Sequence, residues 1–151
     1  AQAGAEAMFS IFNISSINVN RLLSTTLMEY GSTSSLEMVT MVNELVAMSR
    51  FFVSGIPVNK ETLALEVIER VASGDPSSIF LTDDHTFENF MQAQFFPKLL
   101  DRSRYDSWEK AGALNLYQRC NAEAKRILSE HQVEPIPDEI LREIDRILQT
   151  N

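Results

Sequence analysis

The residues of this chain with the clearest chemical character lie between Asn20 and Gly31. A short apolar segment, residues 19–23, leads into small hydroxyl residues and then into Glu29, which is flanked by Met28 and Tyr30. A carboxylate in apolar surroundings can act as an acid, a base or a ligand for a cation. From the residues alone, a substrate-facing glutamate and a solvent-facing glutamate in a loop are equally good interpretations.

The segment 19–23 has the short, apolar, partly β-branched pattern of a buried strand. A lone strand leaves its backbone donors and acceptors without partners. Either the segment is not a strand, or its sheet lies in a part of the protein outside this chain; the uncapped start of the first helix favours the second interpretation. In a parallel β/α barrel, Glu29 would follow the C-terminal end of this strand, where the active sites of such barrels lie.

The other elements are predicted to be helices, because apolar residues recur at helical spacing. Ser34 and Glu37 predict a capping box, and Asn59 and either Asp83 or Asp84 predict further helix starts. Gly112 predicts a bend in the longest helix. The predicted helices cover about residues 1–14, 35–54, 60–73, 85–95, 106–131 and 137–148.

Other sites of chemistry are not indicated, since the chain has no glycine-rich phosphate loop, paired-cysteine zinc pattern or His-Glu-x-x-His helix. His85 follows Asp83 and Asp84, and helix capping explains this cluster better than metal binding. Cys120 lies on the apolar face of its helix and is predicted to be a packed thiol. Because it is the only cysteine, a reducing compartment such as the cytoplasm fits best.

The bulk composition is that of a globular domain. The 151 residues are 44% hydrophobic and 23% charged, with a net charge of −8. This acidic balance argues against a nucleic-acid partner, which requires a basic face. No apolar run reaches the roughly 18 residues of a membrane span.

An ordered set of short stretches resembles the C-terminal region of the trimethylamine methyltransferase family, which includes glycine betaine methyltransferases. The resemblance extends over essentially the whole chain and corresponds to about the last third of a family member. Its most similar stretch is the run Gly-Ile-Pro-Val-Asn-Lys-Glu-Thr-Leu-Ala. The matching stretches are Met28–Gly31, Gly55–Ala64, Phe80–Leu81, His85–Phe90, Pro97–Arg102 and Trp108–Gly112.

The resemblance implies a fold. This chain would be mostly α-helical, with the last strand and helix units of a (β/α)8 TIM barrel followed by a C-terminal helical extension. Residues 1–58 would form the end of the barrel, and residues 59–151 would form the extension that packs on it. The strand partners of residues 19–23 would then lie upstream.

The resemblance also implies a function in methylamine metabolism: transfer of a methyl group from a methylated amine, of the trimethylamine or glycine betaine type, to the cobalt of a corrinoid (cobalamin). The corrinoid would be carried by a separate partner protein. Glu29 would be the catalytic carboxylate, and Asn20 and Tyr30 would bind substrate, Tyr30 through a cation–π contact.

The alternative function is a helical interaction module without catalysis, favoured by the helix content and the acidic charge. In either case the isolated 151 residues are expected to be inactive. Copies of the chain are also expected to associate where apolar surface stays uncovered.

Overall fold

The computed structural model describes residues 2–17, 26–74 and 79–149, and almost all regular structure in them is helical. Two short 3-10 turns, Glu29–Gly31 and Phe80–Thr82, join the longer elements. The helices and strands are α1 (Gln2–Ser16), β1 (Leu27–Met28), β2 (Thr33–Ser34), α2 (Leu36–Val53), α3 (Lys60–Leu63), α4 (Leu65–Ala72), α5 (Asp84–Asn89), α6 (Tyr105–Lys110), α7 (Leu116–Glu130) and α8 (Asp138–Gln149).

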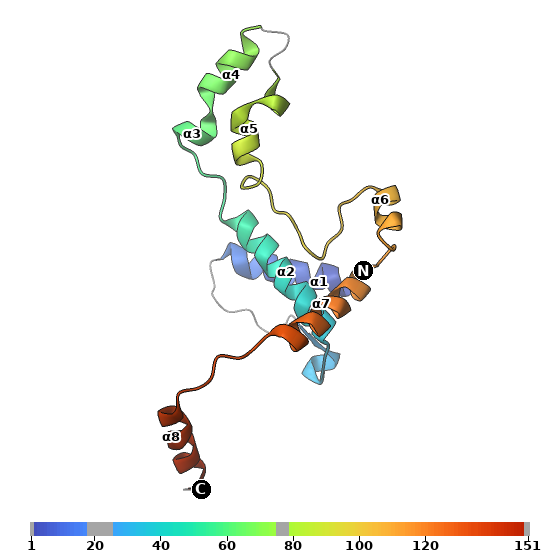
Figure 1. Ribbon diagram of the computed structural model, residues 1–151, viewed down its shortest axis with the longest axis vertical. Helices are drawn as coiled ribbons and strands as arrows, with labels where there is room; N and C mark the ends of the chain where they lie inside the picture. The colour runs from blue at the N-terminus through green and yellow to red at the C-terminus, as the bar shows by residue number, and fades with distance from the viewer. Residues whose placement is uncertain (1, 18–25, 75–78, 150–151) are drawn as a thin grey trace.

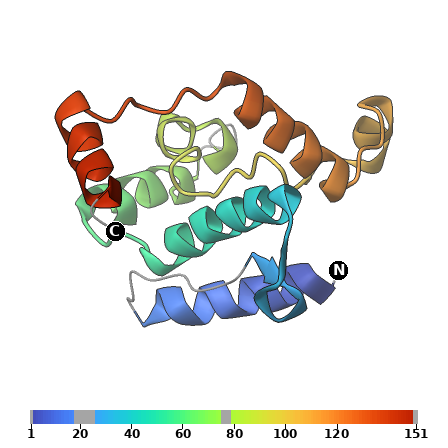
Figure 2. The same cartoon turned by 90° about the horizontal axis from the view of Figure 1, so that it is seen from below.

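The core forms where α1 and α7 pack on α2. Figure 2 shows α2 lying between the other two helices. On the α1 side, Ala7 and Ile11 pack with Val42 and Leu45 of α2. On the α7 side, the buried residues include Cys120 and Ala124. Helix α2 therefore buries two faces, as its nearly continuous apolar sequence predicts.

Two parts of the chain extend away from this three-helix core. Helices α3, α4 and α5 form an arm at one end of the molecule, and α8 lies at the opposite end, beyond the linker 131–137 (Figure 1). None of the residues of α8 is buried.

The segment before α2 forms a small hairpin. Strands β1 and β2 pair antiparallel, with Leu27 opposite Ser34 and Met28 opposite Thr33. The sequence predicted an irregular loop here. The hairpin arises because the backbone of Glu29, Tyr30 and Gly31 takes positive φ values of 51°, 53° and 90°, the left-handed conformation found in tight hairpin turns.

The start of α2 differs by one residue from the prediction. Ser35, not Ser34, is the N-cap, and its side chain accepts a hydrogen bond from the Met38 N–H. Ser34 instead belongs to strand β2. Glu37, the predicted partner in a capping box, binds the Ser35 hydroxyl at 2.7 Å and reaches Asn121 of α7.

The predicted helix 60–73 is interrupted at Ala64, whose φ of 47° lies in the left-handed region. The start at Asn59 is confirmed: its side chain accepts from the Thr62 N–H at 2.9 Å. The carbonyl of Glu61 meets the His85 ring, with 2.9 Å between Nε2 and the oxygen. This contact from α5 stabilises the interruption and is invisible to a local sequence pattern.

The predicted helix 106–131 is two helices, α6 and α7, and not one bent helix. Gly112 has a φ of 102°. Its N–H donates to the Glu109 carbonyl, and the Ala113 N–H donates to the Trp108 carbonyl, both within 3.1 Å. These bonds form a Schellman motif, which ends α6.

The predicted helix 85–95 ends early, since α5 stops at Asn89. The chain beyond it places Phe95 against Phe51 of α2, with ring centroids 5.9 Å apart. Phe96 packs edge-on against Phe90 at 6.3 Å. These aromatic contacts join the arm to the core in place of a longer helix.

The mostly helical class is confirmed. The predicted strand 19–23 lies outside the described residues, and the strands in the described part are the antiparallel β1 and β2. The barrel and the division at residue 58 therefore stay predictions. Across the described ranges, no helix is both long and apolar enough to cross a membrane.

Candidate functional site

Glu29 and Tyr30 lie together at the tip of the β1–β2 hairpin. The paired residues Met28 and Thr33 close the turn, and the residues of both strands and of the turn are exposed. The left-handed conformation of this turn costs non-glycine residues about 1–2 kcal/mol each. The hairpin holds two such residues in succession, and strain of this kind concentrates at functional sites.

The Glu29 carboxylate is held from one side. Its Oε2 accepts hydrogen bonds from Thr33 Oγ1 at 2.8 Å and from Ser32 Oγ at 3.4 Å. The Ser32 hydroxyl also lies 2.6 Å from the Glu29 carbonyl. Among the described residues, Oε1 makes no hydrogen bond, which leaves an acceptor oxygen directed by its neighbours and open to a ligand.

Of the two settings that the sequence left open for this glutamate, the described part of the chain shows the solvent-facing one. Glu29 is exposed, and its nearest polar neighbours are hydroxyl groups. Tyr30 is fully exposed, at 111% of its reference surface, so its ring faces are open. Asn20 lies outside the described residues, so the full predicted group is not brought together here.

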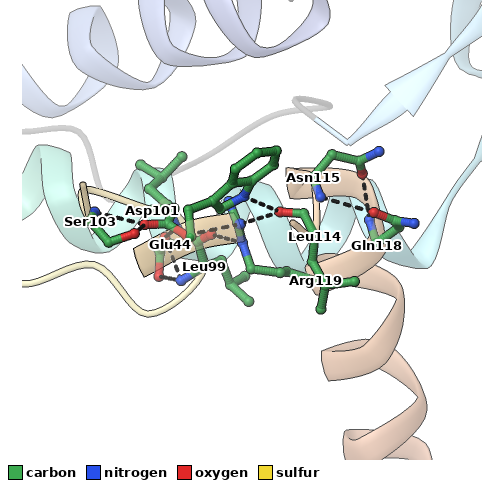
Figure 3. Close-up of polar contacts among 10 residues, drawn as sticks. Glu44, Leu99, Asp101, Ser103, Leu114, Asn115, Gln118 and Arg119 are labelled. Carbon is green, nitrogen blue, oxygen red and sulfur yellow. Dashed lines mark hydrogen bonds and ion pairs between the residues drawn. The ribbon is translucent and has the colours of Figure 1, made fainter. Parts of the chain in front are cut away.

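A second polar cluster joins α2 to the segment 97–101 (Figure 3). Glu44 is buried, with 8% of its surface exposed. Its carboxylate accepts hydrogen bonds from the backbone N–H groups of Lys98, Leu99 and Leu100, with shortest distances of 2.6, 2.7 and 2.7 Å. Several backbone donors satisfy both oxygens, which is what a buried carboxylate requires.

Arg119 of α7 completes the same cluster. Its Nε donates to the Leu99 carbonyl at 2.6 Å, and its NH1 donates to the Leu114 carbonyl at 2.5 Å and to Asp101 Oδ2 at 3.4 Å. Ser103 donates to Asp101 from its hydroxyl and its backbone N–H. These bonds, and then the charge of Arg119, hold the pKa of Asp101 below its usual value.

The cluster is structural in kind, because every strong acceptor is occupied by the chain itself. Neither Glu44 nor Arg119 was predicted from the sequence. A signal existed for Glu44: it is a charged residue directly before Leu45 and Val46, near the middle of a helix rich in apolar residues. A charge at such a position must be paired or hydrogen-bonded.

Glu37 links the first turn of α2 to α7. Its carboxylate accepts from Ser35 Oγ at 2.7 Å and from Asn121 Nδ2 at 2.6 Å. These hydrogen bonds lower the pKa of Glu37 to about 2, since they favour the charged form.

Cys120 is a packed core thiol, as predicted. It is 1% exposed, and its carbonyl accepts from Thr40 Oγ1 at 3.3 Å. Burial raises the pKa of the Cys120 thiol. A thiol of this kind is a poor nucleophile.

The His85 region is a capping cluster. Asp83 accepts from the His85 N–H at 3.0 Å and forms an ion pair with Arg70 at 2.8 Å, so it joins α4 to α5. In the part of the chain that the structure describes, no group of His, Cys, Asp and Glu side chains is placed to hold a metal. The capping interpretation of the sequence agrees with this arrangement.

Two of the hollows in the described surface lie away from the hairpin, and neither is lined by Glu29 or Tyr30. One, of about 800 Å³, lies between α3, α4 and His85. The other, of about 790 Å³, lies between α2, residues 95–99 and α7. Neither of these two hollows therefore includes the hairpin tip, whose residues are exposed.

Comparison with known proteins shows a consistent match. The family described as trimethylamine methyltransferase (MTTB) matches residues 1–150. The trimethylamine methyltransferase MttB of Desulfitobacterium hafniense is 34% identical over 99% of this chain and 29% of its own length. The glycine betaine methyltransferase of the same species is 33% identical over 99% of the chain and 30% of its own length. A trimethylamine methyltransferase MttB of Methanosarcina barkeri is 31% identical over 97% of this chain and 29% of its own length. The chain thus spans less than a third of the length of these relatives.

Proposed function

Since the chain belongs to the trimethylamine methyltransferase family, we propose that it forms part of an enzyme that transfers a methyl group from a methylated amine to the cobalt of a corrinoid protein. The observation that carries the proposal is the family match over residues 1–150. The substrates named in the relatives, trimethylamine and glycine betaine, share a nitrogen that carries methyl groups. That shared centre makes a methylated ammonium compound the proposed substrate class.

The proposed reaction breaks the bond between the methyl carbon and nitrogen, and the amine leaves with the bonding electron pair. The corrinoid supplies the nucleophile that accepts the methyl group. The proposal places the corrinoid on a separate partner protein, as the family resemblance implies, and gives no residue of this chain a role in binding it. The contribution proposed for this chain is to bind and orient the amine.

Glu29 is the proposed catalytic carboxylate facing the cationic substrate. The support is local: Oε2 is fixed by Thr33 at 2.8 Å, while Oε1 makes no bond within the described part of the chain. A carboxylate in this orientation attracts a positively charged nitrogen and holds it in position. Asn20 is proposed as a further substrate contact on the family resemblance alone.

Tyr30 is the proposed cation–π partner. Its ring is fully exposed and adjacent in sequence to Glu29, at the same strained turn. A quaternary ammonium group, such as that of glycine betaine, has no N–H to donate, and an aromatic face binds such a cation. In this proposal, the carboxylate supplies long-range attraction and the ring supplies close contact.

The test is an assay of the gene product that carries this sequence, with a panel of methylated amines and a cob(I)alamin or corrinoid-protein acceptor. Methylation of the acceptor, followed by its absorption spectrum, is expected with at least one amine. Failure with every amine, using a folded protein, would reject the proposal. The isolated chain is expected to be inactive, and turnover by it would contradict our assignment of the site to a larger enzyme.

A non-catalytic interaction module is the second candidate. It is favoured by the apolar side chains that α8 leaves in solvent, such as Ile147 at 55% exposed. This function predicts binding to another protein and no methyl transfer in the assay above.

A further inference from the structure

The chain exposes far more surface than a compact protein of its mass. Its accessible surface is 12605 Å², at a mass of 17.1 kDa. A compact monomer of that mass exposes about 7,800 Å² by the usual scaling of surface with mass. The excess is several times the roughly 800 Å² that each partner buries in a standard protein interface. Much of this surface is therefore not covered by contacts within the chain itself.

Helix α8 has the most regular of these exposed faces. Its apolar residues follow the spacing i, i+1, i+4, i+7, i+8, which gathers them on one face of an amphipathic helix. The polar residues, among them Arg142 and Asp145, lie on the opposite side. The apolar face consists of Ile140, Leu141, Ile144, Ile147 and Leu148, which are between 41% and 70% exposed.

The core offers a groove whose lining is partly apolar and partly charged. The hollow between α2, residues 95–99 and α7 has a volume of about 790 Å³. Apolar side chains on its walls remain in solvent: Val39 is 42% exposed, Phe96 49% and Ile127 40%. Ala47, an exposed residue with a short side chain, also lines this hollow.

The linker between α7 and α8 decides which copy of the helix reaches this groove. Residues 131–137 form no helix, strand or turn, and they contain Pro135 and Pro137. Proline holds itself and the residue before it in extended conformations. Such a spacer covers about 19 Å at the rise of a proline-rich chain. It carries α8 away from its own core (Figure 1).

We propose that two copies of this chain exchange α8, so that the apolar face of each α8 lies in the groove between α2 and α7 of the other copy. The exchange is reciprocal, so one dimer buries two equivalent contacts about a twofold axis. A straight hinge reaches a second copy without reversing direction, whereas a return to the chain's own groove requires a sharp bend within the proline-containing linker.

The first test measures the mass of the 151-residue chain by light scattering and sedimentation over a wide dilution range. The expected mass is twice 17.1 kDa, and Ile144→Asp is expected to halve it. Gln149→Asp makes the same change of charge on the opposite side of α8 and is expected to leave the dimer intact. A chain that ends at His131 is expected to be monomeric, with the circular dichroism of a folded core.

The second test identifies the partner by cross-linking. Chains carrying Ile144→Cys are mixed with chains carrying Ala47→Cys and oxidised, and a disulfide between the two different chains is expected. Cys120 is buried and does not compete. In a chain that carries both substitutions, a disulfide within one chain would show that α8 enters its own groove. A disulfide between two chains would show that α8 enters the groove of the other copy.

Three outcomes would overturn the proposal. A monomer at all concentrations would show that α8 has no partner copy. A 47–144 disulfide formed only within single chains would place α8 in its own groove. A dimer that survives both Ile144→Asp and truncation at His131 would place the interface elsewhere.

Discussion

Glu44 and Arg119 hold the same residue from opposite sides. The Glu44 carboxylate accepts a hydrogen bond from the Leu99 N–H, and the Arg119 guanidinium donates a hydrogen bond to the Leu99 carbonyl. One residue of an irregular segment thereby connects α2 to α7. Stability of the core is thus expected to depend on these two side chains more than on any surface ion pair.

Removing the buried carboxylate is the strongest test of this connection. Glu44→Ala leaves the N–H groups of residues 98–100 without their acceptor. The expected cost is at least about 3 kcal/mol in the free energy of unfolding, since hydrogen bonds to charged groups contribute about 1.5–3 kcal/mol each. Urea denaturation measures it. Glu130→Ala, which removes an exposed partner of Arg126, is the control and should cost under about 1 kcal/mol.

The planar arrangement of the N–H donors of Arg119 is expected to contribute to stability in addition to its charge. Arg119→Lys keeps the charge but cannot bind the carbonyls of Leu99 and Leu114 together. The expected loss is about 1–2 kcal/mol of unfolding free energy. Arg126→Lys, at an exposed pair on the same helix, should change it by much less. Equal losses of unfolding free energy in Arg119→Lys and Arg126→Lys would show that the hydrogen bond from Arg119 to Leu99 adds no more stability than an exposed ion pair.

Stability is expected to fall in acid because of Glu37. Its pKa is about 2 in the folded chain, against an ordinary value of 4.5. A lowered folded pKa contributes stability that is fully present above about pH 4.5 and is lost as the pH falls toward 2. Unfolding free energies measured across that window should decline less steeply in Glu37→Gln. An unchanged slope in this variant would assign the acid sensitivity to other carboxyls, such as Asp101.

The proposed site predicts a change in substrate affinity. In the gene product that carries this sequence, Glu29→Gln is expected to raise KM for a cationic amine about tenfold, equivalent to about 1.4 kcal/mol of lost attraction. Thr33→Val should have a smaller effect in the same direction, because Thr33 only orients the carboxylate. Glu6→Gln, on the exposed side of α1, is the control. Kinetics that match the wild type in Glu29→Gln would remove this residue from the site.

The ring of Tyr30 can be separated from its hydroxyl. Tyr30→Phe keeps the aromatic face and should retain affinity, whereas Tyr30→Ala should weaken amine binding about two- to fivefold, as expected for an exposed cation–π contact of about 0.5–1 kcal/mol. Calorimetric titration with tetramethylammonium, a cation that donates no N–H hydrogen bond, measures this directly. Equal binding by all three proteins would leave Glu29 as the only proposed contact.

The sequence by itself determined most helix starts and the helical class. Asn59 and Asp83 cap helices as predicted, because a capping side chain binds backbone N–H groups two or three residues away. The amphipathic pattern also located α8, whose bounds follow from local periodicity and Pro137. The family followed from short stretches spread over the chain, and the comparisons confirm it.

Only the tertiary structure decided where helices break and what the buried charges do. The interruption at Ala64 involves the contact of Glu61 with His85, 24 residues further along the chain. The role of Glu44 depends on N–H groups 54 to 56 residues away. Hydrogen bonds of this range form only when distant segments are brought together, so no spacing rule along the chain predicts them. The choice between the two settings of Glu29 was also left to the fold: its neighbours are set by the turn of the hairpin and not by the apolar residues that flank it in sequence.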